Sequence, residues 1–262
     1  MTYETLDFEV TDGVATITLN RPDDANALDS RMLQEIFYAA VRCDDDLDIR
    51  AVIVTGSGRF FCAGGDLKDF MAQGDNLPRF LTEKATFLHA GLVRFQRMNA
   101  PVIMAVNGVA AGGGMSMMMG GDVVLASDKA KFVMAYTASG LSPDGTSTYF
   151  LAKHVGLLRA KELMFLNRTL TAEEALDWGL VSKVVPGDDL MATAQAMAAD
   201  FAKGPTLAYG AAKRMMLSAF SNPIETQVEL ETECISNMMR THDGRHGLES
   251  FAAKKTPEFR GE

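Results

Sequence analysis

The chain has 262 residues, of which 47% are hydrophobic and 23% charged, and its formal net charge is −9 at pH 7. This is the composition of an ordinary globular protein with one large core. The excess of acid argues against broad nucleic-acid binding, which needs a basic face, and no apolar run is long enough to span a membrane.

The three cysteines, Cys43, Cys62 and Cys234, are scattered and include no CxxC pair. Isolated cysteines fit a reducing compartment better than a disulfide framework. The four histidines form no cluster with them, so metal-ligand spacing is missing. The opening segment MTYETLDFEV has neither the basic nor the apolar region of a signal peptide. We therefore expect a cytoplasmic protein that holds no metal and inserts in no membrane.

The first predicted elements are a hairpin and a helix. Two β segments flank Asp12-Gly13, a dipeptide that strongly signals a tight turn. Apolar residues then recur at helical spacing over residues 27–46, with Asp29 or Ser30 placed to cap the start of the helix.

Three short apolar runs follow, and each is bounded by turn residues. A helical stretch from about Leu81 to Met98 separates the first run from the second. Continuous apolar runs of this length are typical of buried parallel strands, and their alternation with helices predicts βαβ crossovers. The three runs cover residues 49–58, 100–108 and 122–127.

Past Gly156 helical periodicity dominates, and GLVSKVVP is the last clear strand signal. Two helices are predicted over residues 204–222 and 223–241, each opened by a proline near its first turn. We expect an α/β core over residues 1–200 and a helical region over residues 201–262. The methionines of this region fit either core packing or a subunit interface, and they are Met215, Met216, Met238 and Met239.

Two glycine-bearing loops, over residues 58–70 and 106–116, each lie between a predicted strand and a predicted helix. Ligands of parallel sheets bind at the carboxyl ends of strands, and helix N-termini present unpaired N–H groups. Two such turns side by side could aim two backbone donors at one oxygen, which is an oxyanion hole. The alternative is that the glycines serve close packing only. Neither loop has the spacing of a phosphate-binding loop.

Five segments in order carry a family resemblance that spans almost the whole chain: NRPDDANALD, FFCAGGDLK, NGVAAGGGMSM, LTAEEALDWGLVSKVV and FAAKKTPEF. Together they strongly resemble the crotonase (enoyl-CoA hydratase/isomerase) superfamily. The resemblance implies a spiral of ββα units with a helical C-terminal trimerisation region, assembled as a homotrimer or a dimer of trimers. It also implies acyl-CoA thioester substrates, with coenzyme A as part of the substrate and no further cofactor.

The resemblance also assigns site residues. The backbone N–H groups of Gly65 and Gly113 would form the oxyanion hole that holds an enolate. Phe251 and Lys254 match a motif that reaches the nucleotide, often from a neighbouring subunit, although Lys254 also fits a solvated tail. The remaining expected contacts are Ala25 and Ala27 with the adenine, and Ala63, Asp66 and Leu67 along the pantetheine.

The two glutamates with which a hydratase of this family handles water are missing. Ser116 and Tyr136 stand at their positions, so simple hydration is disfavoured. One acid remains nearby, Asp144, at the position of the acid of Δ3,Δ2-enoyl-CoA isomerases and ring-epoxide isomerases, and of the nucleophile of 4-chlorobenzoyl-CoA dehalogenase. In the absence of the resemblance, Asp144 in SPDG would be read as a turn residue.

Three hypotheses follow. The leading one is double-bond isomerisation with Asp144 as proton shuttle, its pKa raised by partial burial and Tyr136 beside it. The second is an acyl-CoA hydrolase or dehalogenase with Asp144 as nucleophile and His89 as base, although His89 also fits a structural role and Tyr136 replaces an expected tryptophan. The third is an acyl-CoA-binding trimer without catalysis. The sequence does not identify the acyl group.

Overall fold

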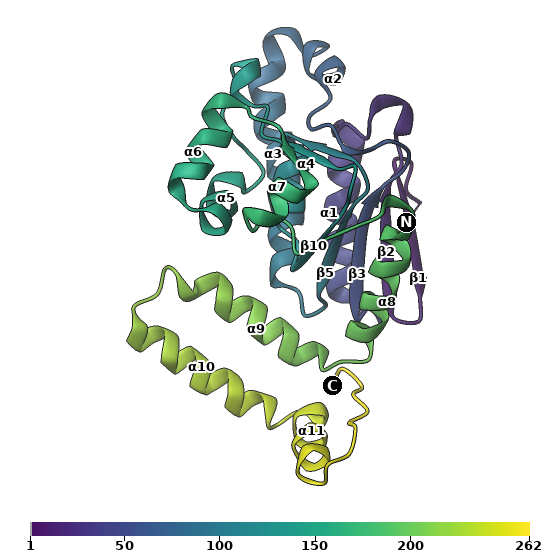
Figure 1. Ribbon diagram of the computed structural model, residues 1–262, viewed down its shortest axis with the longest axis vertical. Helices are drawn as coiled ribbons and strands as arrows, with labels where there is room; N and C mark the ends of the chain where they lie inside the picture. The colour runs from purple at the N-terminus through teal and green to yellow at the C-terminus, as the bar shows by residue number, and fades with distance from the viewer. Residues whose placement is uncertain (1) are drawn as a thin grey trace.

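The computed structural model describes residues 2–262, and a six-stranded sheet in the order β1-β2-β3-β5-β7-β10 forms its centre (Figure 1). The first two strands are antiparallel around Asp12-Gly13, whose φ angles are +50° and +76°, so the predicted hairpin is confirmed. All later neighbours are parallel, and β3, β5 and β7 confirm the three apolar runs. The strands are β1 (Leu6–Thr11), β2 (Val14–Leu19), β3 (Ala51–Gly56), β5 (Val102–Val106), β7 (Val123–Ser127) and β10 (Lys183–Val185).

A second sheet has four strands in the order β4-β6-β8-β9. The sequence did not predict it, because strands of two or three residues are too short to show a period. β4, β6 and β8 each follow a strand of the main sheet and precede a helical segment, so the implied ββα unit is present three times. The strands are β4 (Phe60–Cys62), β6 (Val109–Ala111), β8 (Lys131–Val133) and β9 (Leu170–Thr171).

Helices cover both faces of the main sheet. α8 (Leu190–Ala202) packs its buried alanines on one face. α1 (Ser30–Asp45) and α3 (Leu77–Arg97) pack against each other over the other face, and Asp29 caps α1 by accepting the Met32 N–H at 2.8 Å. The methionine run of α4 (Gly113–Met118) is buried in the same core.

The remaining helical segments connect these layers or extend from them. In the core they are α2 (Leu67–Met71), α5 (Ser147–Val155), α6 (Leu157–Leu166) and α7 (Ala172–Asp177), with the short 3₁₀ segments η1 (Pro22–Asp24), η2 (Gly74–Asn76), η3 (Thr137–Ser139) and η4 (Gly187–Asp189). The C-terminal helices are α9 (Thr206–Ala219), α10 (Ile224–Met238) and α11 (His242–Ala252).

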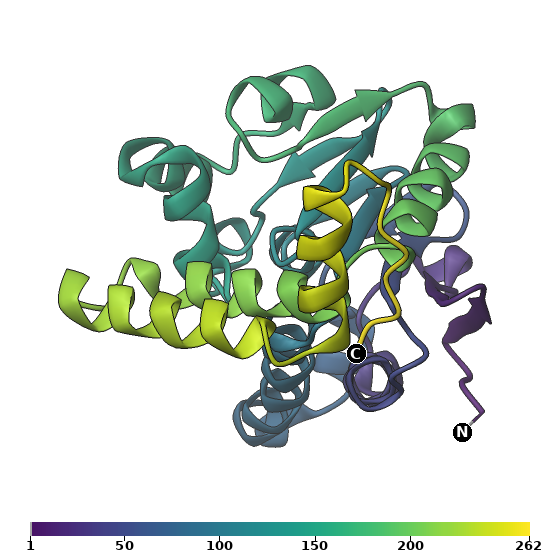
Figure 2. The same ribbon diagram turned by 90° about the horizontal axis from the view of Figure 1, so that it is seen from below.

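The C-terminal helices leave the sheet, and Figures 1 and 2 show α9 and α10 running alongside each other away from it. Both follow the predicted prolines. Met216 and Met239 are exposed and Met215 and Met238 half-buried, so the core-packing interpretation is wrong for the first two. The division near residue 200 into functional units stays a prediction. Over residues 2–262, no helix combines the length and apolarity needed to cross a bilayer.

Candidate active site

The two glycine-bearing loops meet at one edge of the second sheet. β4 and β6 are parallel neighbours, with Phe60 paired to Val109, so the segments that follow them leave the sheet on the same side. The expectation that the loops follow strands of the main sheet directly was wrong, because β4 and β6 intervene. The effect is the same, since two strand ends still place two helix starts together, those of α2 and α4.

The glycines of these loops allow a close approach that side chains would prevent. Gly64 has φ +96°, and a Cβ on it would lie 2.9 Å from the Ala111 carbonyl oxygen and 3.3 Å from the Gly113 nitrogen. A Cβ on Gly114 would lie 2.2 Å from the Cys62 carbonyl oxygen. Packing against backbone atoms therefore explains Gly64 and Gly114. A Cβ on Gly65 or Gly113 would instead meet side chains, the Phe70 ring at 2.6 Å and Leu28 Cδ1 at 3.0 Å.

Gly65 and Gly113 present their backbone to a cavity of about 440 Å³. Within residues 2–262, neither of their N–H groups donates a hydrogen bond to protein. Gly113 is the first residue of α4, where an N–H has no partner inside the helix. Two unpaired donors at one cavity are the elements of an oxyanion hole.

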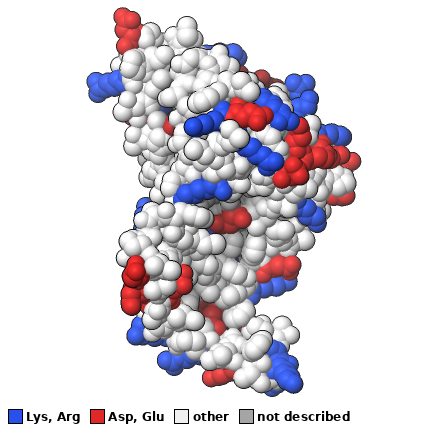
Figure 3. All heavy atoms as spheres, turned by 60° about the vertical axis from the view of Figure 1, so that its left-hand side comes forward, with Lys and Arg blue, Asp and Glu red and all other residues white. Residues whose placement is uncertain are grey.

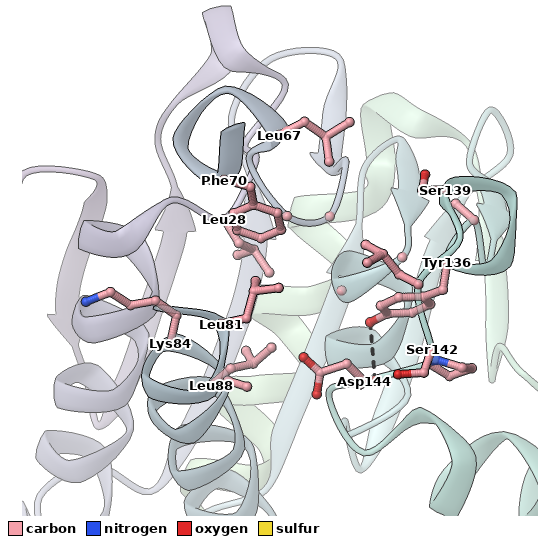
Figure 4. A pocket seen from close by; sticks show the side chains of 18 of the residues that line it. Leu28, Leu67, Phe70, Leu81, Lys84, Leu88, Tyr136, Ser139, Ser142 and Asp144 are labelled. Atoms are coloured by element: carbon pink, nitrogen blue, oxygen red, sulfur yellow. Dashed lines mark hydrogen bonds between the residues drawn. The ribbon is translucent and has the colours of Figure 1, made fainter. Parts of the chain in front are cut away.

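The cavity lies between these loops, α3 and residues 135–144, and Figure 4 shows its largely apolar wall. Leu81, Lys84, Ala85 and Leu88 line it from one face of α3, at the spacing of successive helical turns. The sequence did not single out these side chains. The other apolar side chains of the wall include Leu28, Leu33, Leu67, Phe70 and Leu141.

Asp144 lies across the cavity from α2, and Figure 4 shows its carboxylate directed inward. Asp144 Oδ1 accepts the Gly145 N–H at 2.5 Å and contacts His89 Nε2 on α3. The two side chains are 36% and 46% exposed, so both remain open to water. The contact is attractive only when Nε2 carries a proton, because a bare imidazole nitrogen and a carboxylate oxygen are both acceptors.

Tyr136 joins two parts of this site through its hydroxyl. It pairs with Ser116 Oγ at 2.9 Å and donates to the Asp144 carbonyl oxygen at 3.2 Å. Burial raises the pKa of Tyr136, and the Asp144 charge raises it further against the opposing effect of the Ser116 hydrogen bond. The phenol is therefore neutral at physiological pH.

The expected coenzyme A contacts of the first half of the chain lie together. The Ala63 N–H donates to the Ala25 carbonyl at 3.1 Å, and the Leu28 N–H donates to the Gly64 carbonyl at 2.7 Å. These bonds hold the segment with Ala25 and Ala27 against the first glycine loop. Leu67 is 58% exposed at the cavity.

The Asp66 side chain holds the first glycine loop in place. Its carboxylate accepts from Arg21 at 2.9 Å and from the N–H groups of Lys68 and Asp69 at the start of α2. Burial opposes its ionisation, but these hydrogen bonds outweigh that effect and lower the pKa of Asp66. Its backbone N–H also donates, to the Leu28 carbonyl at 3.1 Å.

Phe251 and Lys254 lie apart from the other expected contacts. Phe251 lies in the last turn of α11 and Lys254 two residues past its end, and Figure 1 places this helix at the opposite end of the molecule from α2. Neither lines the cavity, and Phe251 is 83% exposed. Within one subunit they do not complete the site.

The described part of the chain contains no cluster of metal-ligating side chains. Over residues 2–262, no three His, Cys, Asp or Glu side chains stand where they could hold a metal ion. Cys43, Cys62 and Cys234 are free thiols, and burial raises the pKa of Cys43 and of Cys62 to about 12.

Known proteins match this chain over nearly its whole length. A family model described as enoyl-CoA hydratase/isomerase matches residues 9–262. A Rhodobacter capsulatus protein named "Probable enoyl-CoA hydratase" is 38% identical over 261 residues, 100% of each chain. The 1,2-epoxyphenylacetyl-CoA isomerase of Escherichia coli is 38% identical over 250 residues, 95% of each chain. The 4-chlorobenzoyl coenzyme A dehalogenase-2 of an Arthrobacter species is 33% identical over 253 residues, 96% of this chain and 91% of that one.

Solved structures agree with the sequence matches. The crystal structure of an enoyl-CoA hydratase from Polaromonas sp. JS666 superposes with a TM-score of 0.92 at 30% identity, covering 97% of this chain and 99% of that chain. The backbone arrangement is therefore shared over nearly the whole molecule.

Proposed function

The chain belongs to the enoyl-CoA hydratase/isomerase family, and from that premise we propose that it moves a carbon–carbon double bond in an enoyl-CoA, as a Δ3,Δ2-enoyl-CoA isomerase does. Its fold is the crotonase fold, and its substrates are coenzyme A thioesters. The finer assignment rests on the side chains of the cavity.

One observation carries the proposal. Among the residues that line the cavity within residues 2–262, Asp144 is the only carboxylic acid. It faces the same space as the unpaired N–H groups of Gly65 and Gly113. A carboxylate base and an oxyanion hole at one cavity are the two groups that proton transfer next to a thioester carbonyl needs.

The proposed reaction moves one proton. The Asp144 carboxylate takes a proton from C2 of a 3-enoyl-CoA, and the C–H electrons pass to the thioester oxygen, giving a dienolate held by Gly65 and Gly113. The protonated Asp144 then returns the proton to C4, and the double bond ends between C2 and C3. No atoms are gained or lost.

Hydration is less well supported by the same cavity. Addition of water requires groups that hold and deprotonate it, and the two positions at which the family resemblance expects glutamates carry Ser116 and Tyr136. Their hydroxyls are hydrogen-bonded to one another at 2.9 Å. Relatives named hydratases do not decide the matter, since a relative of equal identity is named an isomerase.

The deciding experiment uses trans-3-hexenoyl-CoA in D₂O with the wild type and Asp144→Asn. We expect the wild type to form the 2-enoyl product, and the variant to lose about 10²–10⁴ of the rate, the usual contribution of a general base. Asp177→Asn, an exposed position on α7, is the matched control. Fast hydration of crotonyl-CoA without any shift of the 3-enoyl double bond would overturn the proposal.

A second candidate function is favoured by the contact between His89 Nε2 and Asp144 Oδ1. In acyl-CoA hydrolysis or dehalogenation, Asp144 would attack the substrate and displace the leaving group. His89 would then deprotonate the water that hydrolyses the resulting intermediate, a mixed anhydride in acyl-CoA hydrolysis and an aryl ester in dehalogenation. The named dehalogenase among the relatives supports this chemistry. A covalent aspartyl intermediate trapped in His89→Gln with aryl thioesters would favour it, whereas unchanged turnover in that variant would remove its support.

Assembly and location extend the proposal. We infer a homotrimer or dimer of trimers, because α6 and the C-terminal helices expose large apolar side chains such as Leu158, Phe220 and Ile235. Figure 3 shows broad areas without charged side chains on the face where these helices lie. The free cysteines fit a cytoplasmic enzyme. Coenzyme A enters as part of the substrate, with no other cofactor, and tight binding of CoA esters without turnover would identify a binding protein instead.

A further inference from the structure

Ser116 occupies an unusual place relative to the second oxyanion donor. Its hydroxyl donates to the Gly112 carbonyl oxygen at 3.1 Å, and its backbone N–H donates to the same oxygen at 2.9 Å. That carbonyl and the Gly113 N–H belong to one peptide group. Because a peptide is a single conjugated unit, hydrogen bonds to its oxygen make its N–H a stronger donor.

Tyr136 links this peptide to the loop that carries Asp144. Because the Ser116 hydroxyl proton is donated to the Gly112 carbonyl, the Tyr136 hydroxyl is the donor to Ser116, and it shares its one proton between Ser116 Oγ at 2.9 Å and the Asp144 carbonyl oxygen at 3.2 Å. Gly145 packs directly on Ser116, since a Cβ on it would lie 2.9 Å from Ser116 Cβ. Ser116 is fully buried. Two hydroxyls therefore connect the oxyanion peptide with the acid loop.

The backbone on either side of this connection is strained. Ala135, directly before Tyr136, has φ +56°, and Thr146, two residues after Asp144, has φ +67°. A β-branched residue in the left-handed region is a clear outlier, and such strain persists only where the surroundings hold it. The hydroxyls of Ser116 and Tyr136 are the side-chain groups that bridge this segment to the oxyanion loop.

We propose that Ser116 and Tyr136 are a pair of positioning residues for the proposed reaction. Ser116 orients and polarises the Gly112–Gly113 peptide toward the thioester oxygen. Tyr136 holds Ser116 and fixes the Asp144 loop at the distance that proton transfer needs. The pair touches no reacting atom, and the inference rests on the proposed function because it assigns the Gly113 N–H to the thioester oxygen.

Polarisation of a bound carbonyl can be measured without turnover. Hexanoyl-CoA labelled with ¹³C at the thioester carbonyl has no double bond to shift, and isotope-edited infrared spectroscopy reports its C=O band when bound. In the wild type we expect the band to move to lower frequency than in water. In Ser116→Ala it should return part of the way, with a smaller return in Tyr136→Phe. Ser127→Ala, a buried serine of β7, is the control that should leave the band unmoved.

Kinetics supply the second readout. We expect Ser116→Ala to lower kcat about tenfold with KM changed less than about twofold, which corresponds to one lost hydrogen bond felt in the transition state. The double variant should be slowed by less than the product of the two single effects, because part of the effect of Tyr136 passes through Ser116.

The outcomes separate the two claims. A wild-type band that does not move on binding would overturn the oxyanion assignment and with it the proposed function. A wild-type shift retained in both Ser116→Ala and Tyr136→Phe would overturn the positioning role alone. Both residues would be structural if the variants lose thermal stability, keep the wild-type position of the bound C=O band, and lose kcat/KM in proportion to the lost stability. If Ser116→Ala does not fold, the smaller change Tyr136→Phe decides.

Discussion

At the scale of single residues, Gly64 is the clearest case of a residue that would affect catalysis through packing alone. The residue donates no hydrogen bond to the expected oxyanion, yet its missing side chain is what leaves room for the Gly113 N–H, 3.3 Å from where a Cβ would lie. We expect Gly64→Ala to displace this donor and to lower kcat about 10²–10³-fold, the loss typical of removing one oxyanion contact. Steady-state kinetics with trans-3-hexenoyl-CoA measure it.

Gly74 provides the matched control for that variant. It also has a positive φ, +52°, but no atom lies within 4 Å of the position of a Cβ. Gly74→Ala therefore imposes the backbone strain without the collision, and activity should be retained. If kcat fell equally in the two variants, the effect of Gly64→Ala would come from backbone strain alone.

Some features of the site could be predicted from the sequence, and others could not. The two glycine-bearing loops could be predicted as places of close backbone approach, because each lies between a strand and a helix, and the family resemblance assigned the donors Gly65 and Gly113 within them. The contact of His89 with Asp144 could not, since 55 residues separate them and no local period relates them. The hydrogen bond from Ser116 to the Gly112 carbonyl was also hidden, because the sequence marks Ser116 only as a residue that stands where the family resemblance expects a glutamate.

At the scale of elements, the C-terminal segment is fastened by one buried carboxylate on α11. Asp243 is 3% exposed, and its two oxygens accept the N–H groups of Arg260 and Gly261 at 2.8 and 2.7 Å. Burial opposes the charge, but these bonds, with His242 and Arg50 nearby, outweigh it and lower the pKa of Asp243. The ionised form therefore belongs to the folded state.

The lowered pKa gives the pH dependence of this contact. Its stabilisation is fully present above the ordinary carboxyl pKa of about 3.9 and is lost as the pH falls through the lower folded value. We expect Asp243→Asn to cost about 1–3 kcal/mol at pH 7, with the difference from wild type shrinking below about pH 4. Urea unfolding at pH 7 and 3.5, with amide exchange at Arg260 and Gly261, measures both. A difference independent of pH would refute this account.

Long elements of the fold could be predicted, and short ones could not. β3 is a continuous apolar run bounded by turn residues, and α1 shows a helical period and a capping residue, so the sequence locates both within a few residues. β4, β6 and β8 span three residues each, and only their pairing with one another reveals a second sheet. Contacts between distant elements were equally hidden, such as Lys213 of α9 bound to Asp122 before β7 at 2.6 Å and to the Phe95 carbonyl of α3 at 2.9 Å.

At the scale of the whole molecule, the unequal placement of the expected coenzyme A contacts suggests how subunits would cooperate. Ala25, Ala63 and Leu67 lie by the cavity, whereas Phe251 and Lys254 lie at the far end of the same chain. A phenylalanine that is 83% exposed is also costly to leave in water. Both facts fit a neighbouring subunit that brings its α11 end to this cavity.

Mixed oligomers test this arrangement directly. Asp144→Asn subunits keep an intact α11 end but lack the acid, and Phe251→Ala/Lys254→Ala subunits keep the acid but lack the end. If a neighbour completes each site, a working site needs the acid from a Phe251→Ala/Lys254→Ala subunit and the α11 end from an adjacent Asp144→Asn subunit. Co-assembly at equal amounts therefore restores about a quarter of the sites. We expect kcat/KM of the co-expressed mixture to exceed the mean of the two parent proteins. The same proteins mixed after separate assembly should give only that mean. Restoration absent from co-assembled oligomers, with light scattering confirming their formation, would place Phe251 and Lys254 outside the site.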